Sequence, residues 1–160
     1  MKVIILSGVS GSGKTTYCKS LGAHYTCSAD QHFMLNGVYK FDAKELGQAH
    51  ANCFYRFIGY MLDSKRSLPV VVDNTNCSTW EISPYVLGAQ AFGAEVEIVT
   101  FVLKPTIEPL AILQKLAECN AHGVGFDTIV GQWSRLKERV LPQFWKNTEI
   151  EVQLGRMGEV

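Results

Sequence analysis

The sequence has no excess of charge of either sign and no apolar run long enough to cross a membrane. Its 15 Lys and Arg residues balance its 15 Asp and Glu residues, so it lacks the overall positive field that draws proteins onto long duplex DNA. The apolar opening at residues 3–6 is too short for a signal peptide and leads directly into a glycine-rich loop. We therefore expect a cytoplasmic protein with no membrane partner.

Paired cysteines are also absent. The five cysteines are odd in number and far apart, and no two of them form a Cys-x-x-Cys pair: Cys18, Cys27, Cys53, Cys77 and Cys119. This spacing argues against a zinc site or dithiol redox chemistry and favours reduced thiols.

The sequence contains no linker, internal repeat or low-complexity segment. No stretch rich in Pro, Ser or charge interrupts the 160 residues, which is the length of one typical domain. We expect a single domain over residues 1–160.

Short β-branched runs alternate with longer helical stretches, and this alternation is typical of a parallel sheet flanked by helices. Strands are expected at residues 2–7, 25–28, 68–73, 96–103 and, with a weaker pattern, 149–154. The predicted fold class is α/β, with a five-stranded parallel sheet and helices on both faces.

Two residue pairs have the spacing of a capping box, in which side chains bond the free amides of a first helical turn. Asp42 with Glu45 predicts a helix over about 43–64, and Ser78 with Glu81 predicts one over about 79–92. Two further helices could be capped by Thr106 and Asp127.

The segment GVSGSGKT at residues 8–15 matches the phosphate-loop motif G-x-x-x-x-G-K-[ST] in full, after an apolar strand and before a helix. Glycines let consecutive amides turn toward phosphates, and the helix points its positive end at them. Lys14 is expected to bridge the β- and γ-phosphates of ATP or GTP, and Thr15 to ligate Mg²⁺. The expected nucleotide-binding residues are Gly8, Ser10, Gly11, Ser12, Gly13, Lys14, Thr15 and Thr16. A plain connecting turn would need neither Lys14 nor Thr15.

Two aspartates follow strands and are candidates for catalysis. Asp73 ends the third predicted strand, where a carboxylate can hold magnesium, and Asn74 and Asn76 behind it could contact phosphate or substrate. Asp30 follows the second strand, where it could accept the proton of an acceptor hydroxyl. The alternative reading is a polar turn at residues 73–76 and a surface Asp at position 30.

We expect the histidines and the aromatic residues to have structural roles. His32, His50 and His122 lack metal-ligand spacing, and a lone histidine is more often a hydrogen-bonded structural residue than a catalyst. The aromatic residues between 54 and 60 have helical spacing and are expected in the core.

Taken together, the motifs resemble the small P-loop kinases related to the 5'-hydroxyl polynucleotide kinase domain, a group that includes zeta-toxin-like proteins. The matching pieces cover about nine-tenths of the chain. They are GVSGSGKT, Ser28-Ala29-Asp30, Ala49-His50, VVVDNTN at 70–76, Trp80-Glu81 with Pro84-Tyr85, and Asn120-Ala121-His122-Gly123-Val124.

The resemblance implies that Asp30 is the general base, that Asp73 and the following asparagines lie in the active site, and that residues 119–126 form a lid. The sequence departs from the family at two places. Gln31 stands where a second acidic residue is common, and Cys119 stands where the lid often has an arginine that stabilises the transferring phosphoryl group. Arg135 or Lys137 could replace that charge.

These observations predict a Mg²⁺-dependent kinase that moves the γ-phosphate of ATP or GTP to a hydroxyl of a nucleic acid end or a nucleotide-like acceptor. One alternative is a kinase acting on a hydroxymethylated base in DNA or on a free nucleoside or nucleotide. An alternative from another class is a nucleotide-binding switch that hydrolyses the nucleotide slowly and has no acceptor.

Overall fold

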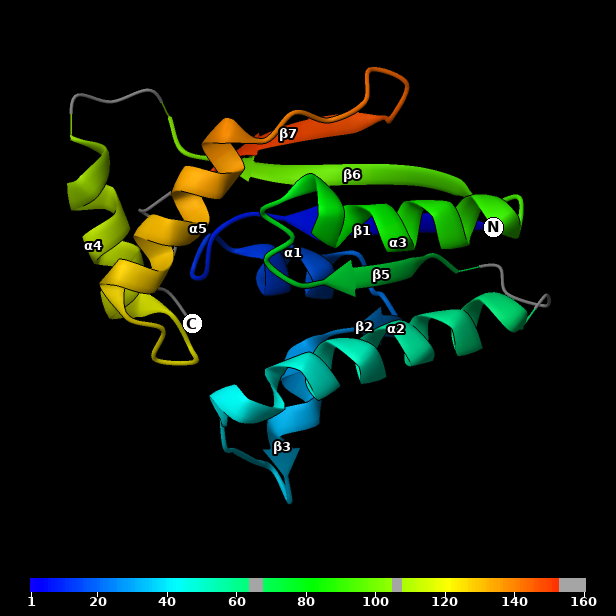
Figure 1. The fold of residues 1–160 in the computed structure, drawn as a ribbon, viewed down its shortest axis with the longest axis horizontal. Coiled ribbons are helices and arrows are strands. Elements are labelled where there is room, and N and C mark those ends of the chain that lie inside the picture. Colours follow the sequence, from blue (N-terminus) through cyan, green and yellow to red (C-terminus); the bar gives the residue numbers. More distant parts are fainter. Residues whose placement is uncertain (64–67, 105–107, 153–160) are drawn as a thin grey trace.

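The computed structural model of the protein describes residues 1–63, 68–104 and 108–152. Five strands form one sheet in the order β2-β5-β1-β6-β7, and all four neighbouring pairs are parallel. The strands are β1 Lys2–Ser7, β2 Tyr25–Cys27, β5 Val70–Asp73, β6 Glu95–Val102 and β7 Asn147–Glu151. The predicted α/β class and the five-stranded parallel sheet are confirmed (Figure 1).

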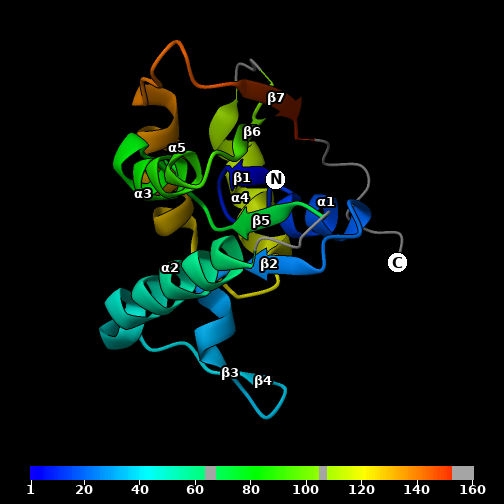
Figure 2. The ribbon, with the colours of Figure 1, turned by 90° about the vertical axis from the view of Figure 1, so that its right-hand side faces the viewer.

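Helices cover both faces of this sheet, which explains why its central strands carry uninterrupted apolar runs at residues 3–6 and 70–72 (Figure 2). On one face α2 (Leu46–Leu62) and α3 (Thr79–Ala91) pack over Val3, Ile5 and Val72. On the other face α1 (Lys14–Ser20) packs over a second cluster that contains Leu6 and Val71.

A third apolar cluster joins α4 (Pro109–Cys119) and α5 (Phe126–Glu138) to the loop after β1. Val9 of that loop is buried against Leu113, Leu116 and Ile129. The two helices are therefore attached to the carboxyl edge of the sheet rather than to one of its faces, and Figure 1 shows them at that end.

The helix predicted from Ser78 and Glu81 is confirmed, including its capping box, in which the Ser78 amide donates to Glu81 Oε2 over 2.6 Å. It ends as predicted before Gly93, which has a φ of 68°.

The other helix predictions need correction. The segment predicted as one helix from residue 43 begins as a 3₁₀ turn, η2 (Ala43–Glu45), because Asp42 caps the Lys44 amide and Glu45 bonds His32 instead of closing a capping box. Asp127 is not a cap: Gly125 is the N-cap of α5, and Asp127 lies in its first turn. Thr106, residue 64 and residues 153–154 lie outside the described residues.

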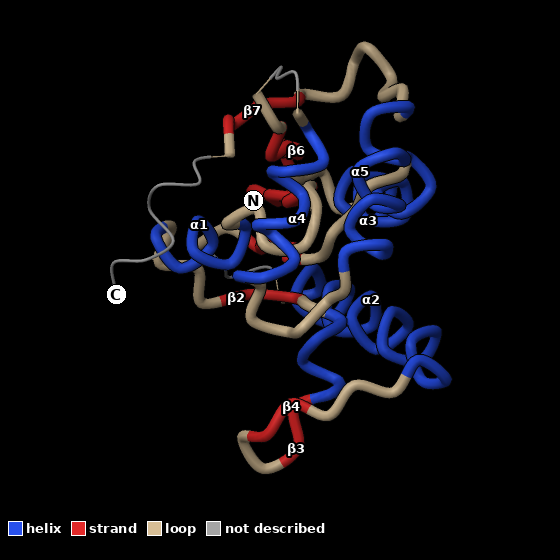
Figure 3. The backbone as a smooth tube through the Cα atoms, turned by 90° about the vertical axis from the view of Figure 1, so that its left-hand side faces the viewer, coloured by secondary structure: helices blue, strands red, loops and turns tan. Residues whose placement is uncertain are grey.

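A short hairpin, β3 (Met34–Leu35) and β4 (Val38–Tyr39), was not predicted. It follows the 3₁₀ segment η1 (Ala29–Phe33) and projects from the body of the protein (Figure 3). Its turn is Asn36-Gly37, with φ values of 51° and 79°. An Asn-Gly pair between apolar residues is a strong hairpin signal, so this turn does have a signature in the sequence.

Candidate active site

The loop between β1 and α1 is shaped by glycines that no other residue could replace. Gly13 has a φ of 94° and Gly11 a φ of 78°. A Cβ on Gly11 would lie 2.9 Å from the Leu116 carbonyl oxygen of α4. Only glycine permits both the left-handed backbone and this close approach, so the loop turns tightly and leads straight into the N-terminus of α1.

Lys14, the first residue of α1, is buried beneath this loop. Its ammonium donates to the carbonyls of Gly8 and Val9 over 2.9 Å and 2.8 Å. Burial lowers the pKa of Lys14, while the carboxylate of Asp73 acts in the opposite direction. A buried cation that rests on loop carbonyls can turn toward a phosphate without leaving the protein interior.

Thr15 and Asp73 form a pair of hard oxygen donors next to the loop. The Thr15 hydroxyl donates to Asp73 Oδ2 over 2.9 Å. Burial raises the pKa of Asp73, and the Thr15 hydrogen bond and Lys14 partly offset this effect. A hydroxyl and a nearby carboxylate fit Mg²⁺, which takes few protein ligands and keeps water and phosphate oxygens. The described residues contain no cluster of three or more His, Cys, Asp or Glu that could hold a metal ion.

Asp30 lies in η1, which is fixed to the end of β2 by a capping box at Ser28. The Asp30 amide donates to Ser28 Oγ over 3.2 Å. The Asp30 carboxylate accepts from the Tyr39 hydroxyl, and the imidazole of His122 lies beside it. Because β2, β5 and β1 are neighbours in the sheet, their carboxyl ends bring Asp30, Asp73 and the glycine loop to one edge.

The two asparagines of the segment after β5 are engaged in bonds within the protein. Asn74 Oδ1 accepts from the Ala29 amide over 2.8 Å and so connects the end of β5 to the start of η1. Asn76 has a φ of 44°, and its side-chain Nδ2 donates to the Leu6 carbonyl over 2.8 Å. Both side chains position the neighbouring strands.

A cavity of about 390 Å³ lies between the loop, the strand ends and the segment after α4. Its lining residues are Ser10, Gly11, Ser12, Gly13, Lys14, Thr15, Thr16, Lys19, Asp30, Asp73, Asn74, Thr75, Cys119, Asn120, Ala121 and His122. The structure thus gathers nearly all the predicted site residues in one place. Gly8 and Asn76 do not line this cavity.

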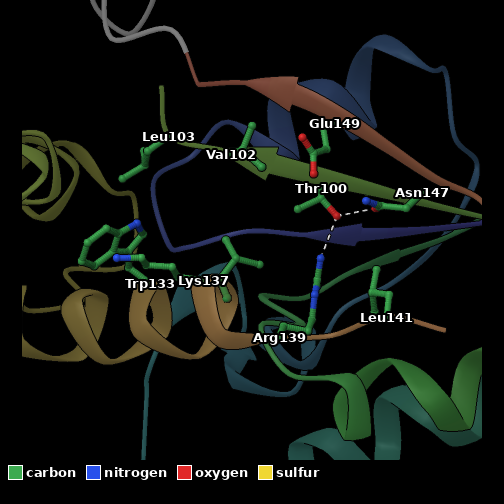
Figure 4. Close-up of a pocket in the computed structure, with 10 residues that line it drawn as sticks. Thr100, Val102, Leu103, Trp133, Lys137, Arg139, Leu141, Asn147 and Glu149 are labelled. Atoms are coloured by element: carbon green, nitrogen blue, oxygen red, sulfur yellow. Dashed lines mark hydrogen bonds between the residues drawn. The ribbon is translucent and has the colours of Figure 1, made fainter. Parts of the chain in front are cut away.

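Arg135 and Lys137, the two residues proposed to replace the charge of a lid arginine, do not line this cavity. The Lys137 ammonium lies 5.3 Å from the ring centre of Trp133, and both residues face a second cavity of about 380 Å³ between α5 and the β6–β7 edge (Figure 4). Lys19 of α1, which was not predicted, is a cation that does line the first cavity.

Two residues beyond the lid region support the site and carry no sequence signal. The buried side chain of Gln132 accepts from the Ser10 amide over 2.8 Å, across 122 positions of sequence. Arg139 donates to Ser7 Oγ and the Asn76 carbonyl, and to Thr100 Oγ1 over 2.9 Å, a contact seen in Figure 4. Burial lowers the pKa of Arg139. Gln132 thus attaches α5 to the glycine loop, and Arg139 attaches the end of α5 to β1 and β6.

The fold and this cavity together define a P-loop protein of the kinase-like type. The sequence profile of the family described as AAA domain (AAA_33) matches residues 3–139, and the chain belongs to this family. The chain is also 31% identical over 135 residues to human NEDD4-binding protein 2. That alignment covers 79% of this chain but 7% of the relative, so the chain spans only a small part of that protein.

Three solved structures share the fold. A proposed kinase from Chloroflexus aurantiacus aligns with a TM-score of 0.63 at 13% identity, over 96% of this chain and 89% of that one. A gluconokinase from Sinorhizobium meliloti gives 0.58 at 14%, over 94% and 82%. The tunicamycin resistance protein of Deinococcus radiodurans gives 0.54 at 16%, over 92% and 85%. At these identities the likeness establishes the fold alone. Among the described residues, no helix has the length and apolar character needed to cross a bilayer.

Proposed function

We propose that the protein is a Mg²⁺-dependent kinase that transfers the γ-phosphate of ATP or GTP to a hydroxyl of a nucleic acid end or a nucleotide-like acceptor. The observation that carries this proposal is the convergence of Lys14, the Thr15–Asp73 pair and Asp30 on one cavity. Lys14, Thr15 and Asp73 are sufficient for binding a nucleotide with its metal ion. The carboxylate of Asp30 has a use only if an acceptor hydroxyl must lose its proton.

In this proposal the residues divide the work between the two substrates. The loop amides and Lys14 hold the β- and γ-phosphates, and Thr15 and Asp73 hold Mg²⁺, which would neutralise charge that develops on the phosphoryl oxygens. Asp30 accepts the proton of the attacking hydroxyl. Residues 119–126 act as a lid, since Cys119 and His122 line the same cavity as the glycine loop.

The chemistry of the acceptor is the finer part of the proposal. The resemblance of GVSGSGKT, Asp30 and the 120–124 segment to polynucleotide kinases supports a nucleic acid or nucleotide-like hydroxyl. The balanced charge favours a short strand or a small molecule over long duplex DNA.

The experiment is transfer of labelled γ-phosphate with Mg²⁺ to a panel of acceptors: 5'-hydroxyl DNA and RNA oligomers, hydroxymethyl-base DNA, nucleosides and nucleotides. We expect one class of acceptor to be labelled by the wild type, and labelling to fall at least about a hundredfold in Lys14→Ala and Asp30→Asn. Failure of the wild type to label any acceptor would count against the kinase assignment.

A second candidate, a nucleotide-binding switch without an acceptor, is favoured by one observation. No arginine lines the cavity within the described residues, and Cys119 stands where the resemblance places one. An arginine in that role contributes roughly three to five powers of ten in rate. A switch would release free phosphate slowly, and Asp30→Asn would hydrolyse the nucleotide like the wild type.

A further inference from the structure

Two elements far apart in the sequence contact the carboxylate of Asp30. The Tyr39 hydroxyl of β4 donates to Oδ1 over 3.0 Å, and His122 Nε2, from the segment between α4 and α5, lies 3.5 Å from Oδ2. The rings of Tyr39 and His122 also contact one another, with centroids 4.4 Å apart and planes inclined by 40°. The hairpin and the lid therefore meet at Asp30.

Tyr39 is held in place by its own element. Its ring packs edge-on against Phe33, with centroids 6.1 Å apart, and the Lys40 amide donates to the Phe33 carbonyl over 2.9 Å. Burial raises the pKa of the Tyr39 phenol, and the nearby charge of Asp30 adds to this effect, so the hydroxyl stays protonated and remains a donor at neutral pH.

We propose that Tyr39 and His122 are positioning residues for Asp30: Tyr39 fixes Oδ1, and His122 closes the 119–126 lid against the side of Oδ2. This inference rests on the proposed function, and it assigns roles to two residues that the phosphate-loop chemistry does not use. With Oδ1 occupied by Tyr39, the oxygen that faces the acceptor is Oδ2.

The separation between Oδ2 and His122 suits this arrangement. At 3.5 Å it exceeds an optimal hydrogen bond, so an acceptor hydroxyl can bond Oδ2 while the imidazole stays beside it. The hydroxyl proton then moves to Oδ2 as its oxygen bonds the γ-phosphorus and the bond from that phosphorus to the bridging oxygen breaks. The nucleoside diphosphate leaves, and His122 keeps water from taking the acceptor's place.

Tyr39→Phe tests the first role. The variant keeps the ring contacts to Phe33 and His122 and removes only the hydroxyl, so the fold is retained. We expect kcat for the acceptor to fall about tenfold, because Asp30 loses a hydrogen bond to its charged form, and KM for ATP to stay within about twofold. The matched control is Tyr55→Phe. Tyr55 was expected in the core but is 72% exposed on α2, so this change should leave both constants unchanged.

His122→Ala tests the second role through the ratio of two products. We expect free phosphate released per phosphorylated acceptor to rise about fivefold, because a lid no longer attached at Asp30 admits water. His50→Ala, at an exposed histidine of α2, is the control and should keep the wild-type ratio.

The outcomes separate this inference from the proposed function. If the wild type labels no acceptor, the proposed function fails first. If the wild type labels an acceptor but Tyr39→Phe keeps the wild-type kcat, or if transfer and hydrolysis fall in parallel in His122→Ala, the positioning roles are wrong while the kinase assignment stands.

Discussion

At the scale of single residues, the site places opposite charges where water is largely excluded. Lys14 and Asp73 are 7% and 8% exposed. Burial lowers the pKa of Lys14 and raises the pKa of Asp73, so in each case it favours the neutral form. In the protein alone, the cost of burying these charges is only partly offset by their neighbours. A bound phosphate or metal ion can offset the remainder. The site is thus built at the expense of stability.

Asp73→Asn should stabilise the metal-free protein. The folded-state pKa of Asp73 is raised above its unfolded value, so ionisation of Asp73 destabilises the folded state as pH rises through that folded pKa. At pH 7 the variant should melt above the wild type, by about 2–4 °C for each kcal/mol gained, while phosphoryl transfer is lost. Thermal unfolding in a chelator between pH 4 and 7 measures this, and the difference should shrink toward pH 4.

A wild type that melts at the same temperature as Asp73→Asn across this range would contradict the stability argument. Asp42→Asn, at an exposed Asp whose carboxylate only caps the Lys44 amide, provides the control for a generic loss of charge.

Gln132→Leu should weaken nucleotide binding without removing any group that touches it. The change leaves the Ser10 amide without its acceptor, so the loop loses a fixed orientation. We expect KM for ATP to rise about three- to tenfold, with a smaller change in kcat. Steady-state kinetics against ATP measures this, with Gln114→Leu on the exposed side of α4 as control. A fall in kcat alone would show that the contact acts elsewhere.

The sequence was informative about residues whose role depends on a local motif and silent about those whose role depends on distant contacts. Lys14 and Thr15 are placed by eight consecutive letters, and Asp30 and Asp73 by the ends of strands. Gln132 and Arg139 form hydrogen bonds with residues 39 to 132 positions away, and no local sequence pattern predicts such contacts. His122 was expected to be structural rather than catalytic, because its closeness to Asp30 exists only after two distant loops come together in the fold.

At the scale of elements, α5 is held at two points that lie about two helical turns apart. Gln132 bonds the glycine loop, and Arg139 bonds the ends of β1 and β6. Movement of the lid is therefore confined to the residues before Gln132, where Gly123 has a φ of 65°.

The five thiols should report on this lid, because four are buried and Cys119 is exposed in the lining of the cavity. Burial raises the pKa of Cys77 to about 11, and those of Cys18 and Cys53 also rise. We expect one thiol per native chain to react rapidly with a disulfide reagent at pH 8, and Mg²⁺ with ATP to slow it severalfold.

Cys119→Ser should abolish the fast phase and supplies the control. Two or more fast thiols, or a rate that saturating nucleotide leaves unchanged, would contradict the placement of Cys119 beside the nucleotide.

Predictions of elements succeeded where one physical signal dominated. The capping box at Ser78 fixed the start of α3, since both of its hydrogen bonds form within four residues. The same spacing at Asp42 and Glu45 did not produce a capping box, because the Glu45 carboxylate bonds the His32 ring instead. The hairpin around Asn36-Gly37 was missed because its strands have two residues each, too few for an alternating pattern.

At the scale of the whole molecule, the neutral net charge limits how much affinity phosphate contacts can supply. We expect binding of a single-stranded oligomer to depend weakly on salt, with log K against log salt no steeper than about −1.5, equivalent to about two phosphates. A titration at 50 to 300 mM salt, followed by fluorescence anisotropy, measures the slope. A slope of about −4 or steeper would indicate an extended nucleic acid groove.

The order of the strands also has a kinetic consequence. β1 is made first and lies at the centre of the sheet, but Val3 pairs with Val70 and Lys2 with Glu95, so both of its neighbours are synthesised much later. Pairing over such separations requires large loops to close and is slow compared with helix formation. Until then an apolar strand remains without partners on a growing chain, and aggregation competes with folding during that interval. For this protein, yield on expression is expected to depend on temperature and chaperones more than on the final strength of its core.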